Sequence, residues 1–221
     1  MEADERVPAG QTGDGLFSRG RLITAGAILA VLVAMGLDTT VVEIGSDEDL
    51  RQAAFDPDAF GQAEFPRISE AVRGRAVEAV FLAEAIAEDK NAAIESYGTK
   101  GGIGAYMPVQ LEAVVGEGKS GIFDLTIEGM PEGTRVRLQT GPAINGTELR
   151  DITGDIIFGA FKNQIEFQDA GAGINRAMAS EVLANLDRDT LTGKSVSVVG
   201  VFNLISAKNW LITPVSLEVE E

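Results

Sequence analysis

Residues 140–151 read TGPAINGTELRD and combine turn-forming dipeptides with an arginine next to a carboxylate. Amides and charges continue from there to Arg176, among isoleucines and phenylalanines. Amide, carboxylate and guanidinium groups hydrogen-bond well to hydroxyl groups, so this pattern predicts a recognition loop over 141–168 for a sugar-like ligand or a protein partner. The predicted contacts are Gly141, Asn145, Thr147, Arg150, Asp151, Asn163, Gln164 and Glu166.

The same polar residues allow a second interpretation. Polar groups that are buried among apolar ones must find hydrogen-bond partners inside the protein. Arg150 and Asp151 would then belong to an internal network that fixes the loop to the rest of the domain. The sequence leaves both interpretations open. Replacing both residues by Ala separates them, because loss of binding in a folded domain supports a contact surface, whereas unfolding supports the internal network.

The carboxylates of this region allow a narrow range of chemistry. Asp151 and Asp155 are four residues apart and Glu166 and Asp169 three apart, without EF-hand spacing. The chain has no histidine and no cysteine, which excludes Ser-His-Asp and Cys-His catalysis and an ordinary zinc site. A carboxylate-dependent glycan hydrolase is the alternative, with Asp151 and Glu166 as acid and base about 5–10 Å apart. We expect no catalytic residue, no metal and no cofactor.

The net charge of −16 restricts the partners of the chain. It arises from 18 basic and 34 acidic residues, and such a surface repels both phosphate backbones and anionic lipid. Nucleic acid is therefore not expected as a partner. A length of 221 residues with 45% hydrophobic residues suffices for one sizeable domain with an appended segment.

An apolar run at residues 22–37 predicts attachment to a membrane. Arginines precede it and acidic residues follow it, so the N-terminus is expected in the cytoplasm and the rest outside it. The run is shorter than the roughly 20 residues of a spanning helix, and residues 39–42 can extend it. We expect residues 1–18 to be a disordered cytoplasmic tail and residues 19–42 to be an anchor or uncleaved signal. A cleaved signal peptide and a buried core helix are the alternatives.

Residues 43–221 are predicted to form a single extracytoplasmic domain. Apolar residues at helical spacing predict a helical region over 65–98 that begins near Pro66. Beyond it the period changes to the alternation of strands. Three strands are expected at 109–116, 121–129 and 135–141, followed by a helix at 169–187 and two final strands. This order is typical of a five-stranded OB-like β-barrel over 109–221, with a helix between strands 3 and 4, and the fold class is α+β.

Several blocks of the sequence resemble one family. They are FDPDAF, EDKNAAIESYG, LQTGPAINGTELRD, FKNQIEFQDAGAGINRAM, LTGKSVSVVGVF and ITPVSLEV, in this order between about residue 41 and the C-terminus. On these motifs the chain resembles the DUF2291 family, bacterial predicted periplasmic lipoproteins without an assigned activity. Its members are often encoded beside components of sugar-type ABC transporters, so the resemblance implies an accessory or binding role outside the cytoplasm.

Two departures from the family pattern affect this expectation. The lipobox cysteine of many members is absent, so a helix rather than a lipid would hold the protein. The tryptophan often found ahead of the first long helix is replaced around Glu64 and Phe65. We expect a non-catalytic accessory protein at the outer face of the bacterial inner membrane, held through residues 22–37. It would bind an ABC transporter component or its sugar-like solute; a purely structural scaffold of a membrane complex is the further alternative.

Overall fold

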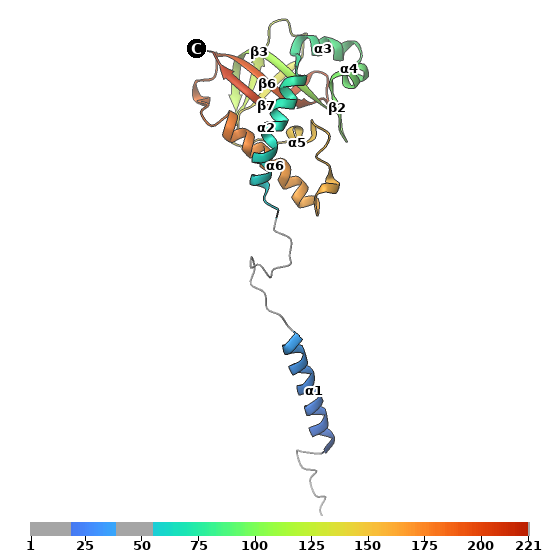
Figure 1. Ribbon diagram of the computed structural model, residues 1–221. Coiled ribbons are helices and arrows are strands. Elements are labelled where there is room, and N and C mark those ends of the chain that lie inside the picture. Colours follow the sequence, from blue (N-terminus) through green and yellow to red (C-terminus); the bar gives the residue numbers. More distant parts are fainter. Residues whose placement is uncertain (1–18, 39–54, 221) are drawn as a thin grey trace, which may run out of the picture. The chain divides into compact units, whose positions relative to one another are not determined.

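The computed structural model describes residues 19–38 and 55–220, which belong to two separate units (Figure 1). The predicted tail over 1–18 and the connection over 39–54 lie outside the described residues. The first unit contributes helix α1, Arg19–Asp38, which contains the apolar run. Among the helices of the described residues, none has the length and apolar character that a membrane crossing requires.

Five strands of the second unit pair in a closed ring. They are β3 (Ala105–Lys119), β4 (Ile122–Thr126), β5 (Arg135–Gln139), β6 (Ser195–Asn203) and β7 (Asn209–Val219). The hydrogen-bonded order is β3-β4-β5-β7-β6, and β6 pairs again with β3. Strands β5 and β7 are parallel, and the other pairs in the ring are antiparallel. Outside the ring, β1 (Val77–Glu78) and β2 (Thr99–Lys100) pair with β3.

Helices lie before the ring and between β5 and β6. They are α2 (Pro57–Arg75), α3 (Ala79–Glu88), α4 (Lys90–Tyr97), α5 (Glu148–Asp151), α6 (Gln164–Val182) and the 3₁₀ turns η1 (Phe158–Ala160) and η2 (Arg188–Thr190). The predicted start near Pro66 was wrong, because Asp56 and Pro57 form the N-cap and first turn of α2 rather than a loop. The helix predicted at 169–187 is α6, which starts and ends earlier.

Successive side chains along a strand point to opposite faces of the sheet, and the domain has a separate hydrophobic core on each face. One face of every ring strand packs into a first core with α3 and α4, where Phe202 stacks on Trp210 at 4.2 Å between ring centroids. The opposite faces of β3, β6 and β7 pack into a second core with α2 and α6. Tyr106 therefore belongs to the second core, while its neighbour Met107 belongs to the first.

Helices α2 and α6 pass each other at a pair of glycines. A Cβ on Gly61 would collide with the carbonyl of Gly173, and a Cβ on Gly173 would collide with the carbonyl of Pro57. Neither position accepts a side chain unless the helices separate. This contact places the first turns of α2 beside α6, as Figure 1 shows at the end of the domain away from the strands.

Candidate functional site

The turn after β5 is held by a buried glutamine. The side chain of Gln139 donates from Nε2 to the carbonyl of Asn145 at 3.0 Å, and the amide of Asn145 donates back to Oε1 at 3.1 Å. The same Nε2 donates to Thr213 Oγ1 at 2.9 Å. The turn that contains the predicted contacts Gly141 and Asn145 is therefore attached to both β5 and β7.

Two glycines bring this turn onto the connection between β3 and β4. The amide of Thr140 donates to the carbonyl of Gly121 at 2.7 Å, and the Thr140 hydroxyl donates to the same oxygen at 3.0 Å. Gly121 has a φ of +74°, and a Cβ on it would collide with the carbonyl of Gly141. Both the backbone conformation and the contact therefore require glycine at position 121.

Asp151 is the centre of a buried polar network. Its Oδ2 accepts hydrogen bonds from Tyr106 Oη at 2.8 Å and from Thr147 Oγ1 at 2.6 Å. Arg150 reaches both carboxylate oxygens, with Nε 2.7 Å from Oδ1 and Nη2 3.1 Å from Oδ2. Arg150 is 8% exposed, and the Asp151 carboxylate compensates its charge, while the two hydroxyl groups complete the hydrogen bonds of that carboxylate.

Arg150 also connects the two halves of loop 141–168. Its Nη1 donates to the carbonyl of Phe167 at 3.0 Å, and its guanidinium carbon lies 3.7 Å from the centroid of the Phe167 ring. A guanidinium this close to an aromatic face is attracted to it. Burial raises the pKa of the Tyr106 hydroxyl, which therefore remains a donor to Asp151 at neutral pH.

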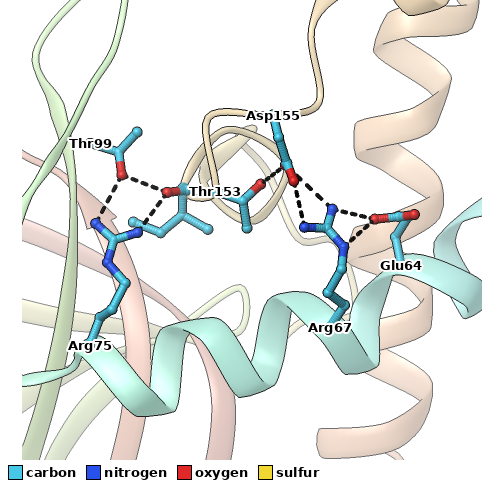
Figure 2. A network of polar contacts seen from close by, with 7 residues as sticks. Glu64, Arg67, Arg75, Thr99, Thr153 and Asp155 are labelled. Atoms are coloured by element: carbon cyan, nitrogen blue, oxygen red, sulfur yellow. Dashed lines mark hydrogen bonds and ion pairs between the residues drawn. The ribbon is translucent and has the colours of Figure 1, made fainter.

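Side chains of helix α2 bind residues 152–155, which directly follow Asp151 in the chain. The side chains in this set of contacts are Glu64, Arg67, Arg75, Thr99, Thr153 and Asp155 (Figure 2). Arg67 donates from Nη1 to Asp155 at 2.6 Å, and Arg75 donates from Nη1 to the carbonyl of Ile152 at 3.2 Å. Hydrogen bonds from Thr153 and then Arg67 lower the pKa of the Asp155 carboxyl. The first turns after α5 are thus fixed to the side of α2.

The second half of the loop, together with Phe55 and Phe60 at the start of α2, forms a group that we call the aromatic end. It consists of five phenylalanines and two isoleucines: Phe55, Phe60, Phe158, Phe161, Phe167, Ile157 and Ile165. The contacting rings have centroids 5.4 to 5.7 Å apart. Three of these side chains are largely exposed: Ile157 at 60%, Phe158 at 51% and Ile165 at 69%. Phe167 lies against Arg150, which joins the aromatic end to the polar network.

The remaining predicted contacts start α6 beside the aromatic end. Asn163 Oδ1 accepts from the amides of Ile165 and Glu166 at 2.9 and 3.0 Å, and the Glu166 carboxylate accepts from the amide of Lys162 at 2.9 Å. These contacts satisfy amides that the helix leaves without partners. Asn163 and Glu166 are therefore used locally, while Gln164 is exposed.

Comparison with known proteins assigns the chain to a family. A family model described as "Predicted periplasmic lipoprotein (DUF2291)" matches residues 27–218, which is most of the chain. The chain belongs to the DUF2291 family. The description of the DUF2291 family supports the expected location outside the cytoplasm and attachment to a membrane. No match was found among curated proteins.

The DUF2291 chain also has a similar solved structure. The crystal structure of an OB-fold protein from Thermotoga maritima superimposes with a TM-score of 0.61 at 18% sequence identity. The match covers 76% of this chain and 99% of the other. This likeness shows an OB-type fold within an α+β chain, as predicted, and the five expected strands are those of the ring.

The structure brings some of the eight predicted residues together and separates others. Thr147, Arg150 and Asp151 share one buried network, whereas Asn163, Gln164 and Glu166 begin α6. Sequence reasoning missed the partners of these residues, namely Tyr106, Gln139 and Phe167. No local pattern identifies them, because each meets its partner through the tertiary fold. In the described residues, no group of three or more acids could hold a metal ion.

Proposed function

We propose that this DUF2291 protein is a non-catalytic accessory protein, held at the membrane by the N-terminal segment that contains residues 22–37. In this proposal its extracytoplasmic domain binds a membrane-bound transporter component through the aromatic end. The observation that carries the proposal is the exposure of Ile157, Phe158 and Ile165 in a loop segment that the contact of Arg150 with Phe167 fixes to the domain. Phe158 also contacts the ring of Phe167, and apolar side chains that gather at an ordered surface are typical of contacts between proteins.

The fixed base supports a contact surface rather than a loose loop. Phe167 is held by Arg150, Arg150 is held by Asp151, and residues 152–155 are held by α2. A surface that is ordered before binding loses little conformational entropy when a partner arrives. The polar network and the apolar contact surface therefore have complementary roles in the same loop.

The net charge of the protein bears on which kind of partner the aromatic end binds. The described part of the domain begins at Phe55, whose ring contacts Phe60 and Phe161 in the aromatic end. The first described residue of the domain therefore belongs to the aromatic end. A net charge of −16 disfavours anionic lipid as the occupant. A membrane protein fits an apolar surface at this position better than the lipid does.

The carboxylates of the loop support a role without catalysis. A general acid or base must reach the proton that it transfers. Asp151 instead accepts hydrogen bonds from Tyr106, Thr147 and Arg150, and Glu166 accepts one from the amide of Lys162. These contacts are structural, and they favour binding over the hydrolase alternative.

A photo-crosslinking amino acid in place of Phe158 tests the contact in intact membranes. We expect an adduct with a transporter subunit, identified by mass spectrometry of the crosslinked band. The matched control is the same amino acid in place of Ile103, which is 75% exposed and lies outside the aromatic end. The proposal fails if both positions give the same adduct, or if position 158 crosslinks only to lipid.

A further inference from the structure

A second site lies on the outer face of β4 and β5, in a cavity of about 360 Å³. Arg135 and Arg137 alternate along β5 with the buried Val136, so both arginines lie on the face opposite the first core. Lys119 and Ser120, at the turn between β3 and β4, line the same cavity. The cavity shares no residue with the aromatic end.

The cavity gathers three cations in an acidic protein. Lys119, Arg135 and Arg137 line it together with two carboxylates, Glu117 and Asp124. Arg135 holds Asp124 in a two-point ion pair, with Nε 2.8 Å from Oδ1 and Nη2 3.0 Å from Oδ2. Arg135 and Asp124 therefore neutralise each other, and the charges of Lys119 and Arg137 exceed that of Glu117.

Arg137 lacks the partner that its position suggests. It lies directly opposite Asp124 in the pairing of β4 with β5, but Asp124 binds Arg135 instead. Arg137 Nη2 donates to Asn209 Oδ1 at 2.9 Å. Its Nε is buried and has no hydrogen-bond partner within the described part of the chain. A buried guanidinium N–H without an acceptor is unfavourable, so the internal contacts of Arg137 are incomplete. Because Nε has no accessible surface, a ligand in the cavity would reach Arg137 at its other guanidinium atoms.

We infer that the cavity binds a small hydroxylated carboxylate of the sugar-acid class, with Arg137 and Lys119 on the carboxylate. The fork of N–H groups in an arginine matches the two oxygens of a carboxylate. The Ser120 hydroxyl and the carboxylate of Glu117 suit the hydroxyl groups of the ligand. A cavity of about 360 Å³ is at the small end of ligand pockets, which favours one sugar unit over a polymer.

The fold supports the same location. OB folds bind saccharides and nucleic acids on the face of their second and third strands, together with the loop between the first and second. Strands β4 and β5 are the second and third strands of the ring, and Lys119 and Ser120 lie at the loop before β4. The net charge of −16 disfavours nucleic acid at this face, whereas a small saccharide with one carboxylate suits the local excess of cations. This inference goes beyond the proposed contact with a membrane protein.

Calorimetric titration of the full-length protein in detergent tests the site with glucuronate, glucose and inorganic phosphate. We expect glucuronate to bind and glucose not to bind. Arg137→Gln should weaken glucuronate binding about tenfold or more, because it removes a charge-assisted hydrogen-bonding group. Arg176→Gln, on the exposed side of α6, is the matched control and should bind glucuronate like the unchanged protein.

The inference is overturned if glucuronate does not bind, or if Arg137→Gln binds it equally well. Phosphate binding without glucuronate binding also overturns it, because the site would then not select a carboxylate. Melting curves establish that each variant is folded. If Arg137→Gln does not fold, Lys119→Gln replaces it, and unchanged affinity in that variant overturns the inference. Crosslinking at position 158 tests the aromatic end independently of these results.

Discussion

The two halves of loop 141–168 differ in how they use their side chains. In the first half, Arg150 is buried and binds the half-buried carboxylate of Asp151. In the second half, Ile157, Phe158 and Ile165 are largely exposed. The polar residues that look suited to recognition are thus occupied inside the domain, and the apolar ones are available at its surface. The contrast teaches that one loop can use its polar groups for internal support and expose its apolar groups at the surface.

The largest expected effect comes from removing Arg150, the buried partner of Asp151. Arg150→Ala leaves Asp151 as an uncompensated charge and should lower the free energy of unfolding by about 3–5 kcal/mol. For a domain of this size that corresponds to a melting temperature lower by roughly 6–20 °C. The control is Arg176→Ala, whose ion pair with Asp58 is exposed and should be worth under about 1 kcal/mol. Equal losses in the two variants would remove the contrast between buried and exposed polar groups.

A slightly smaller effect is expected where the first half meets β3 and β4. Gly121→Ala introduces backbone strain at positive φ of about 1–2 kcal/mol, and its Cβ also collides with the carbonyl of Gly141. We expect a total loss of about 2–4 kcal/mol, measured by urea unfolding. Gly193→Ala is the control, because Gly193 also has a positive φ but no atom within 4 Å of its Cβ position. A Gly193→Ala variant as unstable as Gly121→Ala would show that the contact contributes nothing.

Glu148 gives the buried half a dependence on pH. Burial, and then the charge of Asp151, raise the pKa of the Glu148 carboxyl above its ordinary 4.5, so the folded state favours the protonated form. Its ionisation therefore costs stability above the folded-state pKa, and that cost disappears as the pH falls to 4.5. Glu148→Gln should melt at a higher temperature than the unchanged protein at pH 7 and at the same temperature near pH 4. A constant difference at all pH values would contradict this assignment.

The smallest effect on stability is expected in the exposed half. Ile165→Gln should change the free energy of unfolding by under about 0.5 kcal/mol, because its side chain is 69% exposed. The same change should reduce crosslinking from position 158 to the transporter component. Ile103→Gln is an equally mild change outside the aromatic end and should leave crosslinking intact. A large loss of stability in Ile165→Gln would instead assign Ile165 to the support of the loop.

The sequence predicts much of the ring and little of its surroundings. Alternation locates the five strands and helical spacing locates α6, because both signals come from residues that are neighbours in the chain. The apolar residues at helical spacing within the predicted region 65–98 are divided between two cores, since Ile68 packs into the second core and Ile86 into the first. The short strand β1 separates α2 from α3. Its pairing with β3 is a long-range contact that the sequence of residues 65–98 does not reveal.

The sequence identifies the loop that contains the candidate site, but it does not identify the partners that the loop residues contact in the folded domain. Arg150 and Asp151 can be selected as a pair from their types and adjacency. The partner that buries them comes from β3, because Tyr106 is 45 residues away from Asp151. The aromatic end likewise joins Phe55 to Phe161, and the ring strands β3, β4 and β5 lie between these two residues in the sequence. Such contacts depend on the topology of the ring, which residue types alone do not specify.

The glycine contact between α2 and α6 has a consequence for biosynthesis. About ninety residues separate the end of α2 from the start of α6. At a synthesis rate of about 5–20 residues per second, α2 is complete about 5–18 s before its partner helix exists. During that interval Phe65, Ile68 and Val72 have no helix to cover them. The apolar side of α2 is therefore the surface that a chaperone meets first as the nascent domain emerges.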